Sequence, residues 1–230
     1  MPEITAIERN ARYDQQTVDV MKRVMTDEST GIDVGAHCGS VLAEMLAIAP
    51  RGEHFAFEPL PHMARALRER FPGVSVHECA LSDTHGMSTF EYVTNDPGYS
   101  GLRRREYDRA DPAIAQITVA TERLDDVIPD RVRVDFIKVD VEGGEYHVLA
   151  GGIDMLVRCR PIIVFEAAAR STGLYGVTPD DFHRFFTDRC GMSVSTMERW
   201  LEGRMPYALD EFCANWWAGP EFYFIAYPTR

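Results

Sequence analysis

Short apolar runs of strand type alternate with helical segments from Gly31 onward, and this alternation constrains the fold more than any other feature of the sequence. Because these runs are apolar and rich in β-branched and aromatic residues, strands are expected at residues 31–34, 54–57, 74–80, 134–139 and 161–165. Helices that stop at a proline are expected at residues 40–49 and 61–71. Repeated strand–helix units predict a doubly wound, Rossmann-like α/β sheet whose strands are mostly parallel.

The segments around this alternating part complete the predicted organisation. Residues 1–30 are expected to form a helical extension that packs on the domain or on a partner, and residues 94–112 a mobile loop over the sheet. Residues 86–93 and 117–120 predict further short strands, and residues 221–227 a late, antiparallel edge strand. With 230 residues and 45% hydrophobic content, a single domain spanning the whole chain can bury a full core.

The charge balance argues against one large class of partner. The chain carries 24 basic and 36 acidic residues, a formal net charge of −12, and a domain this acidic repels phosphate backbones. The dense basic run at residues 103–105 is short and is interpreted as a solvated loop. A nucleic-acid partner is therefore disfavoured.

The cysteines and the apolar runs indicate the compartment. Five cysteines are scattered without paired spacing, so neither a zinc site nor a disulfide framework is predicted, and a reducing, cytoplasmic environment is expected. No apolar run reaches the ~18 residues that span a bilayer, and the N-terminus lacks the apolar stretch of a signal peptide. No membrane partner is predicted.

The run from Asp135 to Gly152 places two carboxylates at the end of a predicted strand. The strand is apolar, and Asp140 and Glu142 follow where it should end, beside a glycine pair that lets the chain turn into the next helix. Open α/β sheets bind ligands outside the carboxyl ends of their parallel strands. Asp140 and Glu142 are therefore predicted to lie in the functional site.

A glycine-containing turn closes the first strand and opens the first helix. Gly35 permits a tight turn, and Gly39 would let the backbone approach a ligand at the helix N-terminus. The spacing differs from the Gly-x-Gly-x-x-Gly that binds a dinucleotide pyrophosphate, and Asp33 would repel a phosphate but suits the ammonium group of an amino acid. The candidate ligand contacts in this turn are Asp33, Gly35, Ala36, His37, Gly39 and Ser40.

An acidic residue also ends the second strand. Glu58, followed by Pro59, stands where nucleotide-binding α/β folds accept hydrogen bonds from both ribose hydroxyls. Asp33 and Glu58 together predict a ligand with an amino group at one end and a ribose at the other, which describes S-adenosylmethionine. At the end of the third strand, its adenine would meet Ala80, Leu81 and Ser82.

These motifs, in this order, resemble the FkbM family of methyltransferases. The matching pieces are residues 32–36 with Gly39, 57–59, 80–83 with Gly86, Thr121 with 124–125, and 135–143 with Glu145, 148–149 and Gly151. The resemblance implies a class I, S-adenosylmethionine-dependent methyltransferase that acts on hydroxyls of sugars and other natural products. His37 stands where this family often has Asn, and Gly144 stands where it often has a bulky apolar residue.

Methyl transfer to a hydroxyl needs assistance, because a protonated alcohol is a poor nucleophile. Asp140 and Glu142 supply the oxygen ligands that suit Mg²⁺, Glu166 after the neighbouring strand would complete the set, and the resemblance allows such a metal. Without a metal, Glu142 is the expected general base and Asp140 lies near the sulfonium. The sequence leaves both mechanisms open.

The acceptor is expected to be a saccharide or a glycosylated natural product. Residues 200–220 concentrate aromatic and charged side chains that suit a sugar, but core packing or a dimer contact uses the same residues. Residues 99–102 are candidates to close over the cofactor, and His147 is interpreted as structural. A homodimer involving the N-terminal helix is a further prediction.

Three other functions stay open. A non-sugar small molecule would serve equally as the hydroxyl acceptor. An NAD-dependent oxidoreductase uses a related fold, but the missing dinucleotide motif disfavours it. A non-catalytic binding module is disfavoured by the intact carboxylates at positions 140 and 142.

Overall fold

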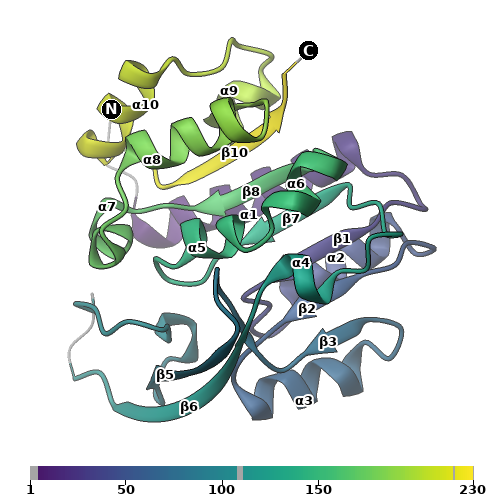
Figure 1. Cartoon of the computed structure of the whole chain (residues 1–230), viewed down its shortest axis with the longest axis vertical. Helices are drawn as coiled ribbons and strands as arrows, with labels where there is room; N and C mark the ends of the chain where they lie inside the picture. The colour runs from purple at the N-terminus through teal and green to yellow at the C-terminus, as the bar shows by residue number, and fades with distance from the viewer. Residues whose placement is uncertain (1–4, 108–110, 220, 230) are drawn as a thin grey trace.

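The strand order of the main sheet reverses beside β1 (Gly31–Val34), so the end of this strand is a topological switch point. The computed structural model describes residues 5–107, 111–219 and 221–229. In this part of the chain the sheet order is β3 (Ser75–His77), β2 (Phe55–Phe57), β1, β7 (Phe136–Val139), β8 (Ile162–Glu166), β10 (Tyr223–Pro228) and β9 (Met192–Thr196) (Figure 1).

Among the described strands of this sheet, β10 alone runs against its neighbours, pairing antiparallel with both β8 and β9. The predicted mostly parallel α/β fold is confirmed, and so is the antiparallel direction of the last strand. This strand lies one place inside the edge of the sheet, because β9, which the sequence analysis did not anticipate, pairs along its outer side.

A second, three-stranded sheet has the order β4 (Ala80–Leu81), β6 (Ile114–Glu122) and β5 (Gly86–Val93), and Figure 1 shows its long ribbon projecting at the lower left. β5 spans residues 86–93, as predicted. β6 is longer than the predicted 117–120, because it pairs with β5 along the whole length from Gly86–Thr121 to Val93–Ile114.

Helices cover both faces of the main sheet. The face that carries Phe136 and Val164 packs against α1 (Ala6–Val24), α2 (Ser40–Ile48), α3 (Pro61–Arg70) and α9 (Met197–Leu201). The face that carries Ile137 and Phe165 packs against α4 (Leu124–Val127), α5 (Glu145–Ala150), α6 (Ile153–Cys159), α8 (Pro179–Arg184) and α10 (Leu209–Ala218). Neighbouring strand residues serve opposite cores because side chains alternate across a strand.

The connection after β8 consists of short helical turns. They are α7 (Ala169–Thr172), a 3₁₀ turn (Gly173–Tyr175) and, directly after α8, a π-helical turn (Phe185–Arg189). The first two of these turns carry the chain from the carboxyl end of β8 toward α8 (Figure 1). It therefore contributes to the edge of the sheet where ligands are expected.

The N-terminal helix α1 is fixed to the domain by its own polar residues. Thr5 and Glu8 form a reciprocal capping box at its start. Further along, Arg12 forms an ion pair of 2.7 Å with Glu221, and the Tyr13 hydroxyl donates to the same carboxylate at 2.6 Å. Of the two predicted arrangements, packing on a partner or on the domain, this structure has the second.

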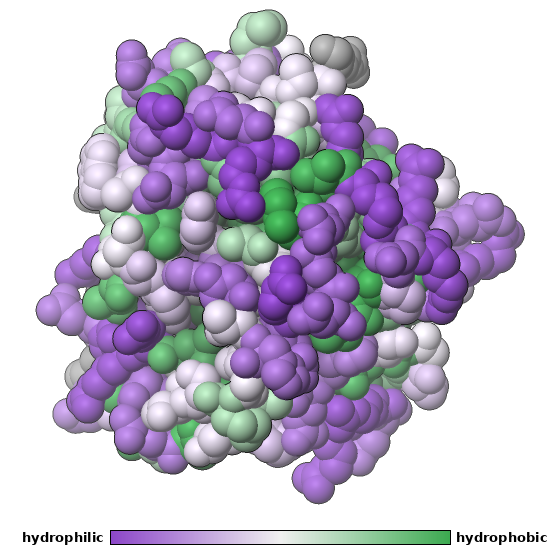
Figure 2. Space-filling model, in the orientation of Figure 1, coloured by the Kyte–Doolittle hydropathy of each residue, from purple (hydrophilic) through white to green (hydrophobic). Residues whose placement is uncertain are grey.

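The predicted loop at residues 94–112 is partly ordered against the small sheet. It contains a 3₁₀ turn (Pro97–Tyr99), and Gly101 forms a β-bridge with Glu91. Residues 108–110 lie outside the described residues. On the face shown in Figure 2, hydrophilic side chains cover most of the area and hydrophobic ones form separate groups. None of the described helices has both the length and the apolar composition to cross a bilayer.

Candidate active site

Two cavities meet at the carboxyl end of β7. The narrow cavity, of about 60 Å³, lies over the ends of β1 and β2, and the wide cavity, of about 900 Å³, lies between α1 and the ends of β8 and β10. Both are lined by Gly98, Asp140 and Glu142. The two carboxylates that the sequence analysis singled out therefore lie where the cavities join.

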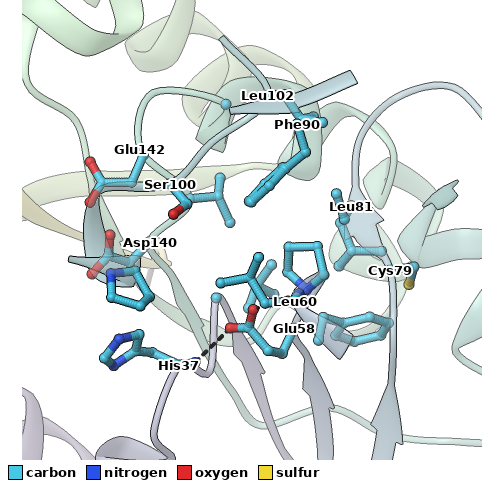
Figure 3. Close-up of a pocket in the computed structure, with 18 of the residues that line it drawn as sticks. His37, Glu58, Leu60, Cys79, Leu81, Phe90, Ser100, Leu102, Asp140 and Glu142 are labelled. Atoms are coloured by element: carbon cyan, nitrogen blue, oxygen red, sulfur yellow. Dashed lines mark hydrogen bonds between the residues drawn. The ribbon is translucent and has the colours of Figure 1, made fainter. Parts of the chain in front are cut away.

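The narrow cavity has a polar side and an apolar side. Figure 3 shows His37, Asp140 and Glu142 along one side and Cys79, Leu81 and Phe90 along the other. The predicted cofactor contacts that line it are Gly35, His37, Glu58, Pro59, Ala80 and Leu81. This lining suits an elongated ligand with a charged end and a flat apolar end.

Glu58 is held in a fixed position at the floor of the narrow cavity. Its Oε2 accepts the backbone N–H of His37 at 2.9 Å, and its Oε1 accepts that of Leu60 at 2.9 Å (Figure 3). Burial raises the pKa of this carboxyl, and the two N–H donors oppose the rise. Each oxygen keeps lone pairs for a ligand, so the carboxylate can receive a pair of hydroxyls.

The other predicted cofactor contacts lie outside both cavities. Ala36 is buried in the core between α1, α2 and the sheet, and Ser40 is exposed beside Cys38. Ser82 donates its backbone N–H to the carbonyl of Glu122. For Asp33, Ala36, Gly39, Ser40 and Ser82, a contact with the cofactor stays a prediction.

The two glycines of the first turn make room for the protein's own atoms. Both have φ +78°, a conformation that favours glycine. A Cβ on Gly35 would lie 1.9 Å from the carbonyl oxygen of Asp140, and one on Gly39 would lie 2.6 Å from the ring of Phe71. Gly35 therefore lets the ends of β1 and β7 approach, and Gly39 lets α2 pack closely against the end of α3.

A buried lysine connects the first strand to the carboxylates of β7. Lys138 is the register partner of Asp33, and its Nζ lies 3.2 Å from Oδ2 of Asp140. Burial acts to lower the pKa of Lys138, but the charges of Asp140 and Asp33 raise it above its usual value. The sequence analysis missed this residue, although a lysine in an otherwise apolar strand, two positions before Asp140, was a usable signal.

Asp140 stays ionised. The hydroxyl of Tyr223, on β10, donates to its Oδ2 at 2.5 Å. Burial acts to raise the pKa of Asp140, but Lys138 and hydrogen bonds from Glu166 and Tyr223 outweigh burial and lower it to about 2. A permanent negative charge therefore lies where the two cavities join.

The pKa of Glu142 is shifted in the opposite direction, upward. Burial, together with the charge of Asp140, raises its pKa well above the usual range, and its ion pair with Arg105 opposes the rise. The guanidinium of Arg105 lies 4.9 Å from the ring centroid of Tyr99, and its side chain is 16% exposed. The interpretation of residues 103–105 as a solvated loop is therefore wrong for Arg105, because aromatic rings shelter it.

The carboxylates that lie closest together differ from the predicted metal set. Among the described residues, Asp140, Glu145 and Glu166 offer oxygens within 4.8 Å of one another, whereas Glu142 has φ +65° and pairs with Arg105. One oxygen of Glu145 accepts the backbone N–H groups of residues 141 and 143, and burial raises its pKa to about 7. Burial and the charges of Asp140 and Glu142 raise the pKa of Glu166.

The wide cavity is built from segments that are distant in the sequence. α1 contributes Arg9, Asn10, Tyr13 and Asp14, and the ends of β8 and β10 contribute Glu166, Phe222 and Tyr223. No described residue from 200 to 219 lines either cavity, and residue 220 is outside the described part. Trp216 instead packs in the core, 3% exposed. The core position of Trp216 agrees with the core-packing alternative for this segment, and its role on the acceptor side stays a prediction.

Two smaller predictions concern the surroundings of the site. Nδ1 of His147 lies 3.1 Å from Oδ2 of Asp83, outside both cavities, in agreement with a structural role. Ser100 and Leu102 line the narrow cavity and Tyr99 lines the wide one, so residues 99–102 lie over both.

Comparison with known proteins identifies a family. The family model described as the methyltransferase FkbM domain matches residues 33–200. "Methyltransferase sdnD" from Sordaria araneosa is 29% identical over 195 residues, covering 65% of this chain and 75% of that protein. "2-O-methyltransferase NoeI" from Sinorhizobium fredii is 32% identical over 147 residues, covering 56% of this chain and 59% of that protein.

A solved structure shows the same fold. The crystal structure of methyltransferase FkbM from Methylobacillus flagellatus KT has a TM-score of 0.54 and 17% sequence identity. The match covers 88% of this chain and 44% of that one, so the chain spans less than half of its length. At this identity the likeness shows the fold alone.

Proposed function

This chain belongs to the FkbM methyltransferase family, and we propose that it transfers a methyl group from S-adenosylmethionine to a hydroxyl of a saccharide or glycosylated natural product. The observation that carries the proposal is the shared lining of the two cavities by Asp140 and Glu142. A donor in the narrow cavity and an acceptor in the wide cavity would meet at these carboxylates. Such positioning supplies a large part of the acceleration in a displacement reaction.

The residues of the narrow cavity fit S-adenosylmethionine. Glu58 offers a fixed carboxylate for the ribose hydroxyls, and Leu81 and Phe90 offer an apolar wall for the adenine. The ionised Asp140 suits the positive charge of the cofactor. When bound, S-adenosylmethionine supplies an electrophilic methyl group on a sulfonium.

Glu142 is the proposed general base. Burial and the charge of Asp140 raise its pKa, and a carboxylate with a raised pKa takes a proton from an alcohol more readily than an ordinary one. With the cofactor bound, the acceptor oxygen would take the methyl group as its bond to sulfur breaks and the neutral thioether leaves, and the proton of the hydroxyl would pass to the Glu142 carboxylate. Asp140 keeps its negative charge throughout, because Lys138 and Tyr223 hold it ionised. The two carboxylates thus have separate roles, set by their surroundings.

A metal at the predicted set fits these residues poorly. Lys138 and Tyr223 already engage Asp140, and Arg105 engages Glu142, so a Mg²⁺ ion would have to displace the protein's own cations. The three carboxylates grouped by the structure include Glu145, which binds backbone N–H groups with one oxygen. We therefore propose a metal-free transfer.

The wide cavity supports a saccharide as acceptor. It combines the aromatic side chains of Tyr13, Tyr99 and Phe222 with carboxylates and guanidinium groups. Sugar rings present both apolar faces and many hydroxyls, so a lining with aromatic surfaces and charged hydrogen-bonding groups is complementary to them. The matched protein from Sinorhizobium fredii, called a 2-O-methyltransferase, supports transfer to an oxygen.

One experiment tests these points together. The protein is incubated with S-adenosylmethionine radiolabelled in the methyl group and a panel of sugars and glycosides, with and without EDTA. We expect label in at least one saccharide and equal rates in both conditions. Label in no saccharide would contradict the proposed acceptor, and a loss with EDTA that Mg²⁺ restores would contradict the metal-free mechanism.

A further inference from the structure

The wall that α1 contributes to the wide cavity is a continuous polar face of this helix. Arg9, Asn10, Tyr13 and Asp14 follow helical spacing, so their side chains lie on the same side. Resting on the proposed function, we infer that this face selects a saccharide that carries an anionic group, a carboxylate or a phosphate, which binds to the guanidinium of Arg9.

Arg9 differs from the other arginines of the cavity. Arg105 is paired with Glu142, and Arg170 lies 3.3 Å from Glu106. Arg9 takes part in no ion pair among residues 5–107, 111–219 and 221–229, and its Nε is buried without a hydrogen-bond partner there. The cavity therefore contains one guanidinium whose charge the described part of the protein does not compensate.

The position of Arg9 is fixed by its neighbours. Its guanidinium lies 5.9 Å from the ring centroid of Phe222. One turn further along α1, Arg12 and Tyr13 anchor the helix to Glu221, beside Phe222. The positive charge is thus held in place rather than free to turn into solvent, which favours recognition of a ligand.

The cavity contains charges of both signs. Asp140 and Glu142 lie where it joins the narrow cavity. Arg9 lies beside Phe222 on the wall that α1 contributes. A neutral sugar would cover Arg9 without compensating its charge, which is costly for a partly buried ion. A carboxylate or phosphate would compensate it through paired hydrogen bonds, while a hydroxyl of the same sugar points to Glu142 and Asp140.

The test measures kcat/KM for three matched acceptors: a neutral glycoside, the corresponding uronic acid glycoside and the corresponding sugar phosphate. The variants are Arg9→Gln and, as a control for net charge, Lys22→Gln, which removes a cation from an exposed position of the same helix. We expect the wild-type protein to favour one anionic acceptor over the neutral glycoside. Arg9→Gln should lower kcat/KM for that acceptor about 10- to 100-fold and change the neutral one little.

The outcomes separate this inference from the function on which it rests. A preference for the uronic acid identifies a carboxylate, and a preference for the sugar phosphate identifies a phosphate. Equal rates for neutral and anionic acceptors, or an equal loss for all of them in Arg9→Gln, would overturn the anionic acceptor and leave methyl transfer to saccharides standing. Absence of transfer to every saccharide by a protein that binds adenosylhomocysteine would overturn both.

Discussion

The two cavities that meet at β7 differ in how the chain builds them. The narrow cavity is formed mainly by residues that directly follow β1, β2 and β7 or belong to β4, and its far wall is apolar. The wide cavity joins α1, the segment around Tyr99 and Arg105, and the ends of β8 and β10. The comparison teaches that local sequence at strand ends forms the narrow cavity, whereas the wide cavity depends on which distant segments pack together.

The same contrast appears in the two carboxylates at the junction. Asp140 and Glu142 are two residues apart, yet the pKa of the first is lowered and that of the second is raised. Burial acts to raise both pKa values, but Lys138 and hydrogen bonds from Glu166 and Tyr223 outweigh it at Asp140, whereas the charge of Asp140 adds to it at Glu142. The predictions below test whether the two sides of the site are as distinct as this geometry indicates.

The largest effect is expected from Glu142→Gln. Removing the general base should lower kcat by roughly 10²- to 10⁴-fold in single-turnover assays while adenosylhomocysteine still binds. Glu166→Gln is the matched comparison: an amide keeps the size of the side chain and can still donate a hydrogen bond to Asp140, so it should cost less than about threefold. Equal losses in both variants would contradict the separate roles.

Two adjacent glycines should respond very differently to alanine. Gly143 has φ +109°, and a Cβ there would lie 2.6 Å from the carbonyl oxygen of Ser171, so Gly143→Ala should destabilise the fold by about 2–4 kcal/mol. Gly144 has φ −83°, and the nearest atom to its Cβ would be 3.5 Å away, so Gly144→Ala should stay within about 1 kcal/mol. Denaturant unfolding measures both, and similar midpoints would contradict the packing argument.

Glu58→Gln should weaken cofactor binding without changing acceptor binding. The amide cannot accept both N–H donors and both ribose hydroxyls, so the Kd of adenosylhomocysteine should rise about 10- to 100-fold in calorimetry. Glu44→Gln, at an exposed position of α2, should leave Kd unchanged. If Glu58→Gln instead changes acceptor KM and spares cofactor binding, the assignment of the narrow cavity to the cofactor fails.

Arg105→Gln should shift the pH dependence of the reaction. Burial raises the pKa of Glu142, and the positive charge of Arg105 opposes that rise, so its loss raises the pKa further. Since the base acts only when deprotonated, activity falls as pH drops below this pKa, and the acidic limb of kcat should move up by about one pH unit. Arg103→Gln, which leaves Arg105 in place, should keep the profile, and a downward shift in Arg105→Gln would contradict the assignment.

Much of the fold could be predicted because its signals are local. The strands at residues 31–34 and 86–93 have the predicted bounds, and α2 and α3 end within one residue of the prediction. β9 was missed, because a short strand with a mixed pattern becomes a strand only when β10 offers it a partner. Position in the sheet is likewise set by pairing, so β10 lies inside the edge.

The residues of the site also fall into those that the sequence predicted and those that it did not. Glu58, Asp140 and Glu142 could be placed from the sequence, because each directly follows a parallel strand. Arg9, Arg105 and Tyr223 could not, since nothing in their local sequence distinguishes them from exposed polar residues or an ordinary strand. A homodimer and a cytoplasmic location stay predictions from the sequence.

The sequence by itself determined a doubly wound α/β fold and the carboxylates that follow its strands, because strand periodicity and residues at strand ends act over a few positions. Only the tertiary structure decided which cations balance these carboxylates and which helix lines the wide cavity. Lys138, Arg105 and Tyr223 reach Asp140 and Glu142 through packing between distant segments, and the charge of each carboxylate depends on those neighbours. The charges of the two carboxylates and the lining of the wide cavity are therefore properties of the folded chain.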